Sequence, residues 1–175
     1  MKRSSMVRLG GTILMVGGLM AGPLSASAAH KTSAPNWVST KGKVVSLKLV
    51  AEFNKNDSGF NFNGASKGQL TVTIPLGDKV NVTFSNNGVL PHSAQVVAFS
   101  KTPPTKAVKD AFKGAHSTNL TSGIAKGKVQ KFSFTANKAG NYLIICAVPG
   151  HASAGMWDKL VVSKTAKSAS AVTKM

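Results

Sequence analysis

The stretch Cys146-Ala-Val-Pro-Gly-His151-Ala-Ser-Ala-Gly-Met156 places a thiol, an imidazole and a thioether in one short segment, with four residues between each donor and the next. It follows the apolar run Leu143-Ile-Ile145, so the thiol is predicted to lie at the end of a buried strand. Pro149, Gly150 and the small residues after them favour tight turns. We therefore expect a compact loop that holds three donor side chains at one end of a β-fold.

These donors indicate a copper site. One thiolate, one imidazole and a weak thioether are typical of a blue-copper electron-transfer centre, which also needs a second imidazole. His92, in Val-Leu-Pro-His-Ser, is the candidate, because it lies where a loop enters a predicted strand. We predict His92, Cys146 and His151 as the strong ligands and Met156 as the weak axial ligand. Such a set suits both Cu(II) and Cu(I), so little rearranges when one electron moves.

The single cysteine fits this interpretation. Cys146 has no partner for an internal disulfide, and the chain contains no Cys-x-x-Cys-His motif, which excludes covalent haem attachment. Pro149 also removes one backbone N–H that could have bonded the thiolate. Because an apolar setting with few hydrogen bonds to sulfur raises the reduction potential, we expect a high potential.

The N-terminal segment, residues 1–28, is typical of an export signal. Lys2, Arg3 and Arg8 precede an apolar run of about twelve residues, and Ala26-Ser27-Ala28 supplies small residues for cleavage. The run is short for a membrane span, which needs about 20 residues. We expect an exported, periplasmic or extracytoplasmic protein, with retention of the segment as an N-terminal membrane anchor as the alternative.

The chain is strongly basic, with 22 Lys and Arg residues, five Asp and Glu residues and a net charge of +17. The three basic residues of the N-terminal segment account for part of this, so the remainder has a net charge of +14. The lysines are scattered and aromatic residues make up only 6%, which argues against nucleic-acid binding. We favour adaptation to acid, because few carboxylates can be protonated as the pH falls. Steering of an acidic partner is a possible secondary role.

The pattern of apolar residues predicts an all-β fold, a Greek-key β-sandwich with one short helix over residues 103–113. The predicted strands are 44–50, 69–74, 80–84, 93–99, 129–135, 141–147 and 160–163. Strands 69–74 and 80–84 are expected to form a hairpin or at least to be neighbours. The asparagines of Phe60-Asn-Phe-Asn-Gly64 are expected to bond nearby backbone.

The domain is predicted to span residues 44–163. Residues 29–43 form a polar lead-in, and residues 164–175, rich in Ala, Ser, Lys and Thr, are expected to be a disordered tail. His30 and His116 lie in polar segments and are interpreted as solvent-exposed rather than as ligands.

Residues 146–157 and Leu90-Pro-His-Ser93 resemble the cupredoxin family, most closely the sulfocyanin group and next the rusticyanins. Phe60-Asn-Phe-Asn-Gly64, the Val-Pro-Gly-His segment at 148–151 and Gly155-Met-Trp157 are similar to sulfocyanin motifs. The resemblance covers about residues 44–163. It implies a Greek-key cupredoxin fold, one type 1 copper ion, and electron carriage in the respiratory chains of acidophiles, with transient redox partners such as a cytochrome or terminal oxidase.

The resemblance also implies roles for further residues. Ser93 corresponds to a residue that helps to fix the ligand loop in rusticyanins. His151 is implied to be the electron port, inside an apolar patch formed by Val89, Leu90, Pro91, Pro149, Ala152 and Ala154. The protein is expected to be a monomer whose partners dock transiently on such a patch. Sulfocyanins commonly keep an N-terminal helix as an anchor, whereas the signal here looks cleavable, so membrane association rests on whether residues 1–28 are retained.

Four other interpretations compete with mononuclear electron transfer. A copper enzyme would need additional histidines, and only His30 and His116 remain, neither in a His-x-His pair. A dinuclear electron-transfer site would need a second cysteine. An extracytoplasmic copper carrier using the same ligands, and a structural sandwich with an inert cysteine, stay open as alternatives.

Overall fold

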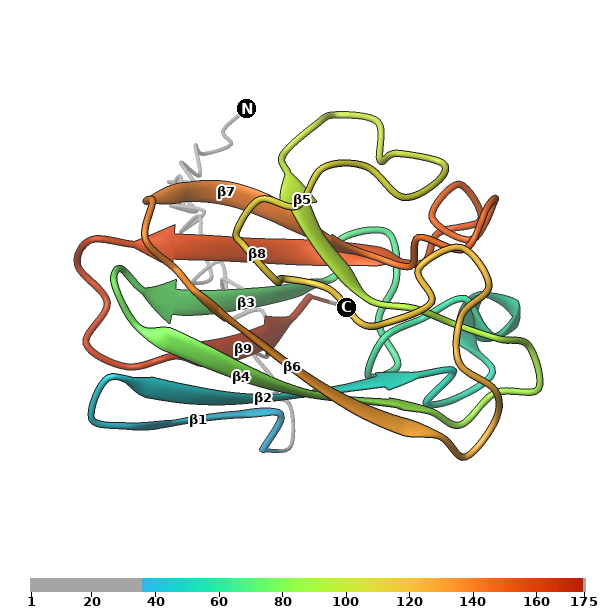
Figure 1. The fold of residues 1–175 in the computed structure, drawn as a ribbon, viewed down its shortest axis with the longest axis horizontal. Helices are drawn as coiled ribbons and strands as arrows, with labels where there is room; N and C mark the ends of the chain where they lie inside the picture. The colour runs from blue at the N-terminus through green and yellow to red at the C-terminus, as the bar shows by residue number, and fades with distance from the viewer. Residues whose placement is uncertain (1–35, 175) are drawn as a thin grey trace, which may run out of the picture. The chain divides into compact units, whose positions relative to one another are not determined.

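A computed structural model describes residues 36–174, which fold into two packed β-sheets (Figure 1). One sheet has the strand order β1-β2-β4-β6 and the other β5-β7-β8-β3-β9. The strands are β1 Val38–Lys41, β2 Val44–Ala51, β3 Leu70–Pro75, β4 Lys79–Asn86, β5 Gln95–Ala98, β6 Val129–Thr135, β7 Gly140–Ile145, β8 Trp157–Ser163 and β9 Ser170–Thr173. The predicted all-β sandwich is confirmed.

The core lies between the two sheets and follows from strict alternation along the strands. In β2, Val45, Leu47 and Leu49 are buried while the residues between them are exposed, and β4 repeats the pattern. These two strands pair in parallel, Val45 opposite Val80 and Leu49 opposite Phe84. Because side chains alternate across a strand, one face of this sheet is buried and the other meets water.

The expected pairing of strands 69–74 and 80–84 is wrong. β3 pairs with β8 and β9, whereas β4 pairs with β2 and β6 in the other sheet. The turn between them bonds outward: Leu76 N–H donates to Ser163 O and Gly77 N–H donates to Ala136 O. These bonds direct the chain from one sheet to the other. The turn between β3 and β4 therefore connects the two sheets, although its sequence is typical of a hairpin.

The predicted helix over residues 103–113 is also wrong, and the only helical element among the described residues is a 3-10 turn, η1, at Asn56–Gly59. The backbone of the segment bonds to β5: Ala111 N–H donates to Val96 O. The Gln95 side chain donates to Val108 O at 2.6 Å and to Asp110 Oδ1 at 2.7 Å. The polar groups that a helix would have paired internally are thus satisfied by β5.

The fold extends beyond residues 44–163 at both ends. β1 lies within the expected lead-in and pairs antiparallel with β2. β9 lies within the expected disordered tail and pairs antiparallel with β3. The predicted signal or anchor at residues 1–28 lies outside the described residues. Within residues 36–174, no helix has the length and apolar character needed to cross a membrane.

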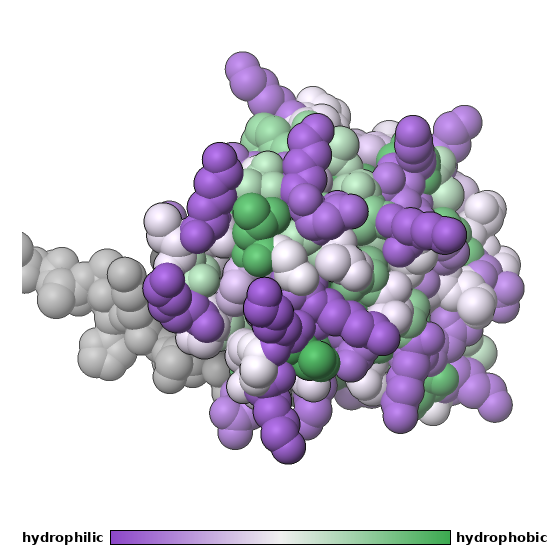
Figure 2. Space-filling view, turned by 60° about the vertical axis from the view of Figure 1, so that its left-hand side comes forward, coloured by the Kyte–Doolittle hydropathy of each residue, from purple (hydrophilic) through white to green (hydrophobic). Residues whose placement is uncertain are grey.

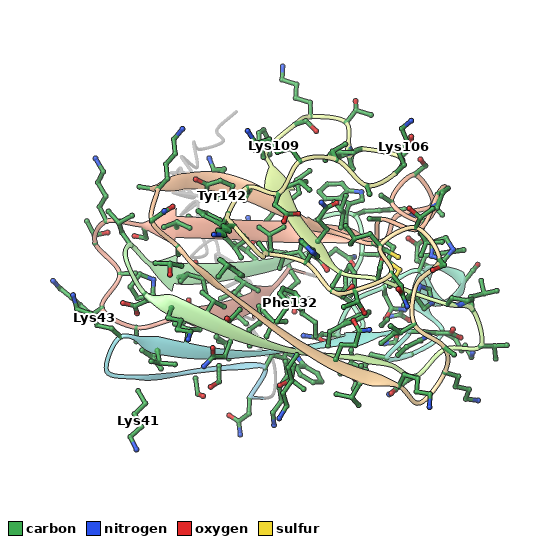
Figure 3. The ribbon with its side chains drawn as sticks, viewed as in Figure 1. Lys41, Lys43, Lys106, Lys109, Phe132 and Tyr142 are labelled. Atoms are coloured by element: carbon green, nitrogen blue, oxygen red, sulfur yellow. The ribbon has the colours of Figure 1, made fainter. Side chains whose placement is uncertain are left out.

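Lysines are spread over the surface rather than gathered into one basic face. The face shown in Figure 2 carries hydrophilic side chains across most of its area, with small apolar areas between them. Lys41 and Lys43 lie around the β1–β2 turn, whereas Lys106 and Lys109 extend from the loop that follows β5 (Figure 3). The loops that carry the predicted ligands gather at one end of the sandwich, on the right in Figure 1.

Candidate metal centre

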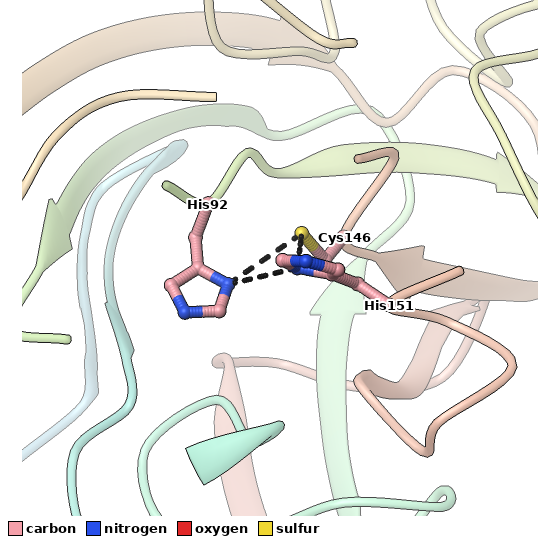
Figure 4. A group of neighbouring side chains, drawn as sticks. All are labelled: His92, Cys146 and His151. Atoms are coloured by element: carbon pink, nitrogen blue, oxygen red, sulfur yellow. Dashed lines mark hydrogen bonds between the residues drawn. The ribbon is translucent and has the colours of Figure 1, made fainter. Parts of the chain in front are cut away.

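His92, Cys146 and His151 converge at that end, with one donor atom of each lying within 4.8 Å of the others (Figure 4). Sγ of Cys146 lies 3.8 Å from Nδ1 of His92 and 3.4 Å from Nδ1 of His151, and the two Nδ1 atoms are 3.2 Å apart. The structure therefore brings together three of the four predicted ligands, although His92 and Cys146 are far apart in the sequence.

This arrangement fits a copper ion. A first-row metal ion bound at about 2.1 Å by three donors in a plane sets those donors about 3.6 Å apart. The distances between the three donors bracket that value. The three donor atoms are near enough to one another for a single cation to contact all of them. One thiolate and two imidazoles are, moreover, the donors that copper prefers in a type 1 site.

His92 is held by backbone bonds and by close packing. The backbone N–H of His92 donates to Ile124 O, and the backbone N–H of Ile124 donates to His92 O at 2.7 Å. Gly123 has a φ of +70°, and a Cβ there would lie 2.7 Å from His92 N. The buried Asn86 side chain donates to Leu90 O and Ile124 O, both at 2.8 Å. These contacts fix the loop before β5, so the imidazole is positioned before any metal arrives.

Cys146 directly follows β7 and is fully buried. Its N–H donates to Met156 O at 3.0 Å, and Ser93 N–H donates to its sulfur at 3.4 Å. Burial raises the pKa of the Cys146 thiol, while the backbone N–H groups of Ser93 and Val148 lower it. The cost of a buried charge keeps the free thiol protonated, and a bound cation reverses that preference.

The two imidazoles also favour their neutral, metal-binding form. Burial, followed by the proximity of His151, lowers the pKa of His92 to about 4, with Glu52 acting in the opposite direction. Burial likewise lowers the pKa of His151. Burial therefore favours the uncharged, metal-binding form of both side chains.

Met156 closes the ligand loop and belongs to the core. Its side chain is fully buried and its N–H donates to His151 O at 3.0 Å. The N–H of Cys146 in turn donates to Met156 O. These two backbone bonds hold Cys146, His151 and Met156 together at one end of the sandwich. Its axial role stays a prediction, supported by this placement.

A covering loop, residues 52–68, lies against the site. The Phe60 ring meets the His151 ring edge-on, with centroids 5.0 Å apart, and lies 6.5 Å from the His92 ring. The side chain of Asn61 accepts from Phe53 N–H and donates to Asn54 O, as predicted. Asn63 bonds Val50 N–H and Lys48 O of β2. These amides hold the covering loop onto the sheet and Phe60 over the imidazoles.

Glu52, which the sequence analysis did not single out, faces the site from the start of the covering loop. Its Oε2 lies 3.9 Å from Nε2 of His92. The hydrogen bond from Lys55 is the main cause that lowers the pKa of Glu52. Nothing in the sequence links Glu52 to His92, apart from the rarity of carboxylates in this chain.

The predicted apolar patch is only partly formed. Val89 and Leu90 are exposed, by 74% and 48%, and Pro91 is exposed beside them. Ala152, by contrast, is only 1% exposed. It belongs to a small buried apolar cluster with Val97 and Leu143, so its assignment to the patch is wrong. His151 is half-buried.

Of the two remaining histidines, His116 is the one that lies within the described residues, and it contributes no donor to this site. His116 pairs with Asp110 through its Nδ1 at 2.5 Å and lies outside the three-residue donor group. His30 falls outside the described residues.

Comparisons with known proteins agree with this geometry. Residues 32–173 match the family model of the Sulfocyanin (SoxE) domain. Sulfocyanin of Sulfolobus acidocaldarius is 36% identical over 132 residues, covering 71% of this chain and 66% of that protein. Rusticyanin of Acidithiobacillus ferrooxidans is 33% identical over 103 residues, covering 58% of this chain and 65% of that protein. The chain thus spans less than two thirds of either relative.

The fold agrees as well. A rusticyanin crystal structure superposes with a TM-score of 0.53 and 29% identity, covering 71% of this chain and 80% of that one. The family match includes β1 and β9 as well as the four predicted ligands. Since the match covers most of the chain and copper donors converge at one end of the sandwich, the chain belongs to the sulfocyanin family of blue copper proteins.

Proposed function

We propose that this protein carries single electrons through one type 1 copper ion, between transient redox partners of an exported respiratory chain in an acidic environment. Copper, when bound, supplies the Cu(II)/Cu(I) couple. The observation that carries the proposal is the convergence of His92, Cys146 and His151 within 4.8 Å, on a backbone fixed by its own hydrogen bonds. A site held in this way needs little rearrangement between oxidation states.

Burial of the donors favours electron transfer over copper carriage. His92 is 1% exposed and Cys146 and Met156 are fully buried, so a partner protein could not reach them to exchange the ion. His151 alone is half-buried, and Val89 and Leu90 in the loop before His92 are exposed. This arrangement supports His151 as the electron port and the apolar residues beside it as a weak docking surface.

Relatives and composition support the remaining parts of the proposal. Sulfocyanin and rusticyanin are electron carriers and not enzymes, which agrees with a non-enzymatic role here. Five carboxylates in the whole chain leave few groups to protonate in acid. The N-terminal pattern supports export, which N-terminal sequencing of the secreted protein would test, because cleavage leaves a new terminus near Ala28.

The deciding experiment is the visible spectrum of the Cu(II)-loaded protein beside a Cys146→Ala variant. Electron transfer predicts an intense blue band that ascorbate bleaches and an oxidant restores, and that the variant lacks. Voltammetry should show a reversible one-electron wave. A colourless protein that takes up and releases Cu(I) would favour the copper carrier instead, and a protein that binds no copper would contradict both.

A further inference from the structure

We propose that Glu52 is a positioning residue for the copper site: its carboxylate accepts the Nε2–H of His92 and so aims the Nδ1 lone pair at the metal. The inference rests on the proposed copper function and adds a residue outside the donor set. It starts from one observation, that Nε2 of the buried His92 has no hydrogen-bond partner among the described residues.

The carboxylate of Glu52 is the group placed to satisfy this nitrogen. Nε2 of His92 lies on the side of the ring that points away from Cys146 and His151 (Figure 4), and Oε2 of Glu52 lies 3.9 Å from it. A buried N–H without an acceptor costs about 1–3 kcal/mol, so a small approach of the two side chains is favoured. Ligand histidines in metalloproteins commonly donate their second N–H to a carboxylate, which fixes the ring and its tautomer.

The surrounding backbone is built to admit this carboxylate. A Cβ on Gly88 would lie 1.8 Å from Oε2 of Glu52, and a Cβ on Gly59 would lie 2.9 Å from its Cδ. Both glycines are buried. The Glu52 side chain therefore occupies a space that exists only because two neighbouring positions lack side chains.

Two further contacts hold the carboxylate in place. Val89 N–H donates to Oε2 at 3.1 Å, and the ammonium group of Lys55 bonds the other oxygen, Oε1, on the solvent side. Glu52 is 10% exposed at its side chain, whereas Lys55 is 84% exposed. The anion is thus fixed by one hydrogen bond on each oxygen, and its Oε2 lies near His92.

Tautomer control is the chemical consequence. Neutral imidazole carries its proton on one nitrogen only, and a carboxylate beside Nε2 favours the proton there. Nδ1 then keeps the lone pair that the metal needs. Without the carboxylate, the Nδ1–H tautomer becomes populated, and this form must shift its proton before copper can bind.

The experiment compares Glu52→Ala, Glu52→Gln and Gly88→Ala with the natural protein and with Asp57→Asn. Asp57 is the matched control, since it is a second lysine-paired carboxylate of the covering loop, bonded to Lys67 and not to His92. Gly88→Ala displaces the carboxylate without removing it. The readouts are NMR of the imidazole N–H groups in the copper-free protein, which reports the tautomer of His92, and copper affinity by competition with a chelator.

We expect the copper-free natural protein to hold His92 as the Nε2–H tautomer, and Glu52→Ala and Gly88→Ala to show a mixture. Copper affinity should fall by about 10–100-fold in both. Glu52→Gln keeps an acceptor oxygen and should keep the tautomer, with a smaller loss of affinity. Removal of the negative charge should also raise the reduction potential in Glu52→Ala and Glu52→Gln.

An unchanged tautomer and an affinity within twofold in Glu52→Ala and Gly88→Ala would overturn the proposal. The proposal would also be overturned if Asp57→Asn lost as much copper affinity as Glu52→Ala, because the effect would then come from the stability of the covering loop. If Glu52→Ala does not fold, Glu52→Gln and Gly88→Ala decide. A natural protein that binds no copper contradicts the proposed function; one that binds copper regardless of Glu52 contradicts only this inference.

Discussion

The backbone amide of Ser93 lies 3.4 Å from the sulfur of Cys146, and the hydroxyl of the same serine accepts the N–H of Ala147 at 3.1 Å. The hydroxyl also donates to Leu120 O at 2.8 Å. One side chain thus connects the loop before β5, the cysteine strand and the loop around Leu120. The resemblance to rusticyanins implied such a role for Ser93, and these contacts supply a physical basis for it.

Ser93→Ala should therefore destabilise the copper-free protein by about 1–3 kcal/mol, because the buried Ala147 N–H and the Leu120 carbonyl lose their partner. Chemical denaturation measures the change. The control is Ser46→Ala on the exposed face of β2, which should change stability by less than about 0.5 kcal/mol. Equal stabilities of the two variants would show that the Ser93 bonds contribute nothing net.

Phe60→Ala should lower the reduction potential. The ring lies against His151 at 5.0 Å and excludes water from the two imidazoles, and a wetter site stabilises the more highly charged Cu(II). Voltammetry measures the potential. Phe53→Ala is the matched control, because Phe53 is in the same loop but is 46% exposed and packs on Trp37. A potential that moves equally in both variants would contradict a shielding role for Phe60.

Gly155→Ala should destabilise the ligand loop strongly. Gly155 has a φ of +115°, and a Cβ there would lie 2.1 Å from Oδ2 of Asp57 and 2.9 Å from Cε of Lys67. We expect a loss of more than about 2 kcal/mol on denaturation, since strain adds to a clash in a buried place. Gly77→Ala tests strain alone, because Gly77 has a φ of +88° and open space around its Cβ.

The clash can be relieved, which makes this prediction specific. A double variant, Gly155→Ala with Asp57→Ala, should recover part of the loss. If Gly155→Ala lowers the free energy of unfolding by no more than Gly77→Ala does, the close approach of Asp57 to the ligand loop does not affect stability.

The copper protein should keep its blue band from neutral pH down to about pH 4. Burial lowers the pKa of His92 to about 4, so protons compete for its imidazole only near and below that pH. Absorbance followed during acid titration tests this. Loss of the band near pH 6.5, the ordinary range of a histidine, would contradict the proposal of an acid-adapted carrier.

The same shift has the opposite consequence for the copper-free protein. The unfolded chain takes up a proton on His92 near pH 6.5, whereas the folded chain does so only near pH 4. The contribution of His92 to stability is therefore complete above pH 6.5 and is lost as the pH falls to about 4. Between pH 6.5 and about 4, the free energy of unfolding of the copper-free protein should decrease as the pH falls. The His92→Gln variant should show a smaller decrease, which chemical denaturation at a series of pH values measures.

The sequence predicts the local elements best where alternation is strict. Val129–Thr135 is predicted and observed with the same bounds as β6, and the strand Val44–Val50 differs from β2 by one residue. The convergence of His92, Cys146 and His151 was predictable because two of these residues lie in one short loop and their donor chemistry admits few metals. Each of these signals is contained in a few neighbouring residues.

Features that depend on distant partners were not predictable. The segment 103–113 has the composition of a helix, but the Gln95 side chain and the backbone of β5 take its polar groups. β9 lies in a stretch of small and polar residues and exists because β3 offers it an open edge. Glu52 lies near His92 only because β2 ends beside the loop before β5, which no local pattern indicates.

The order of the strands has a consequence for assembly. His92 precedes β5 and Cys146 follows β7, and these strands pair in one sheet although β6, between them in the sequence, belongs to the other. The chain must cross to the second sheet and return before the two donors can meet, and such long-range pairing forms late and slowly. We therefore expect copper insertion to follow the pairing of β5 with β7, so that a blue colour would appear only once both sheets are complete.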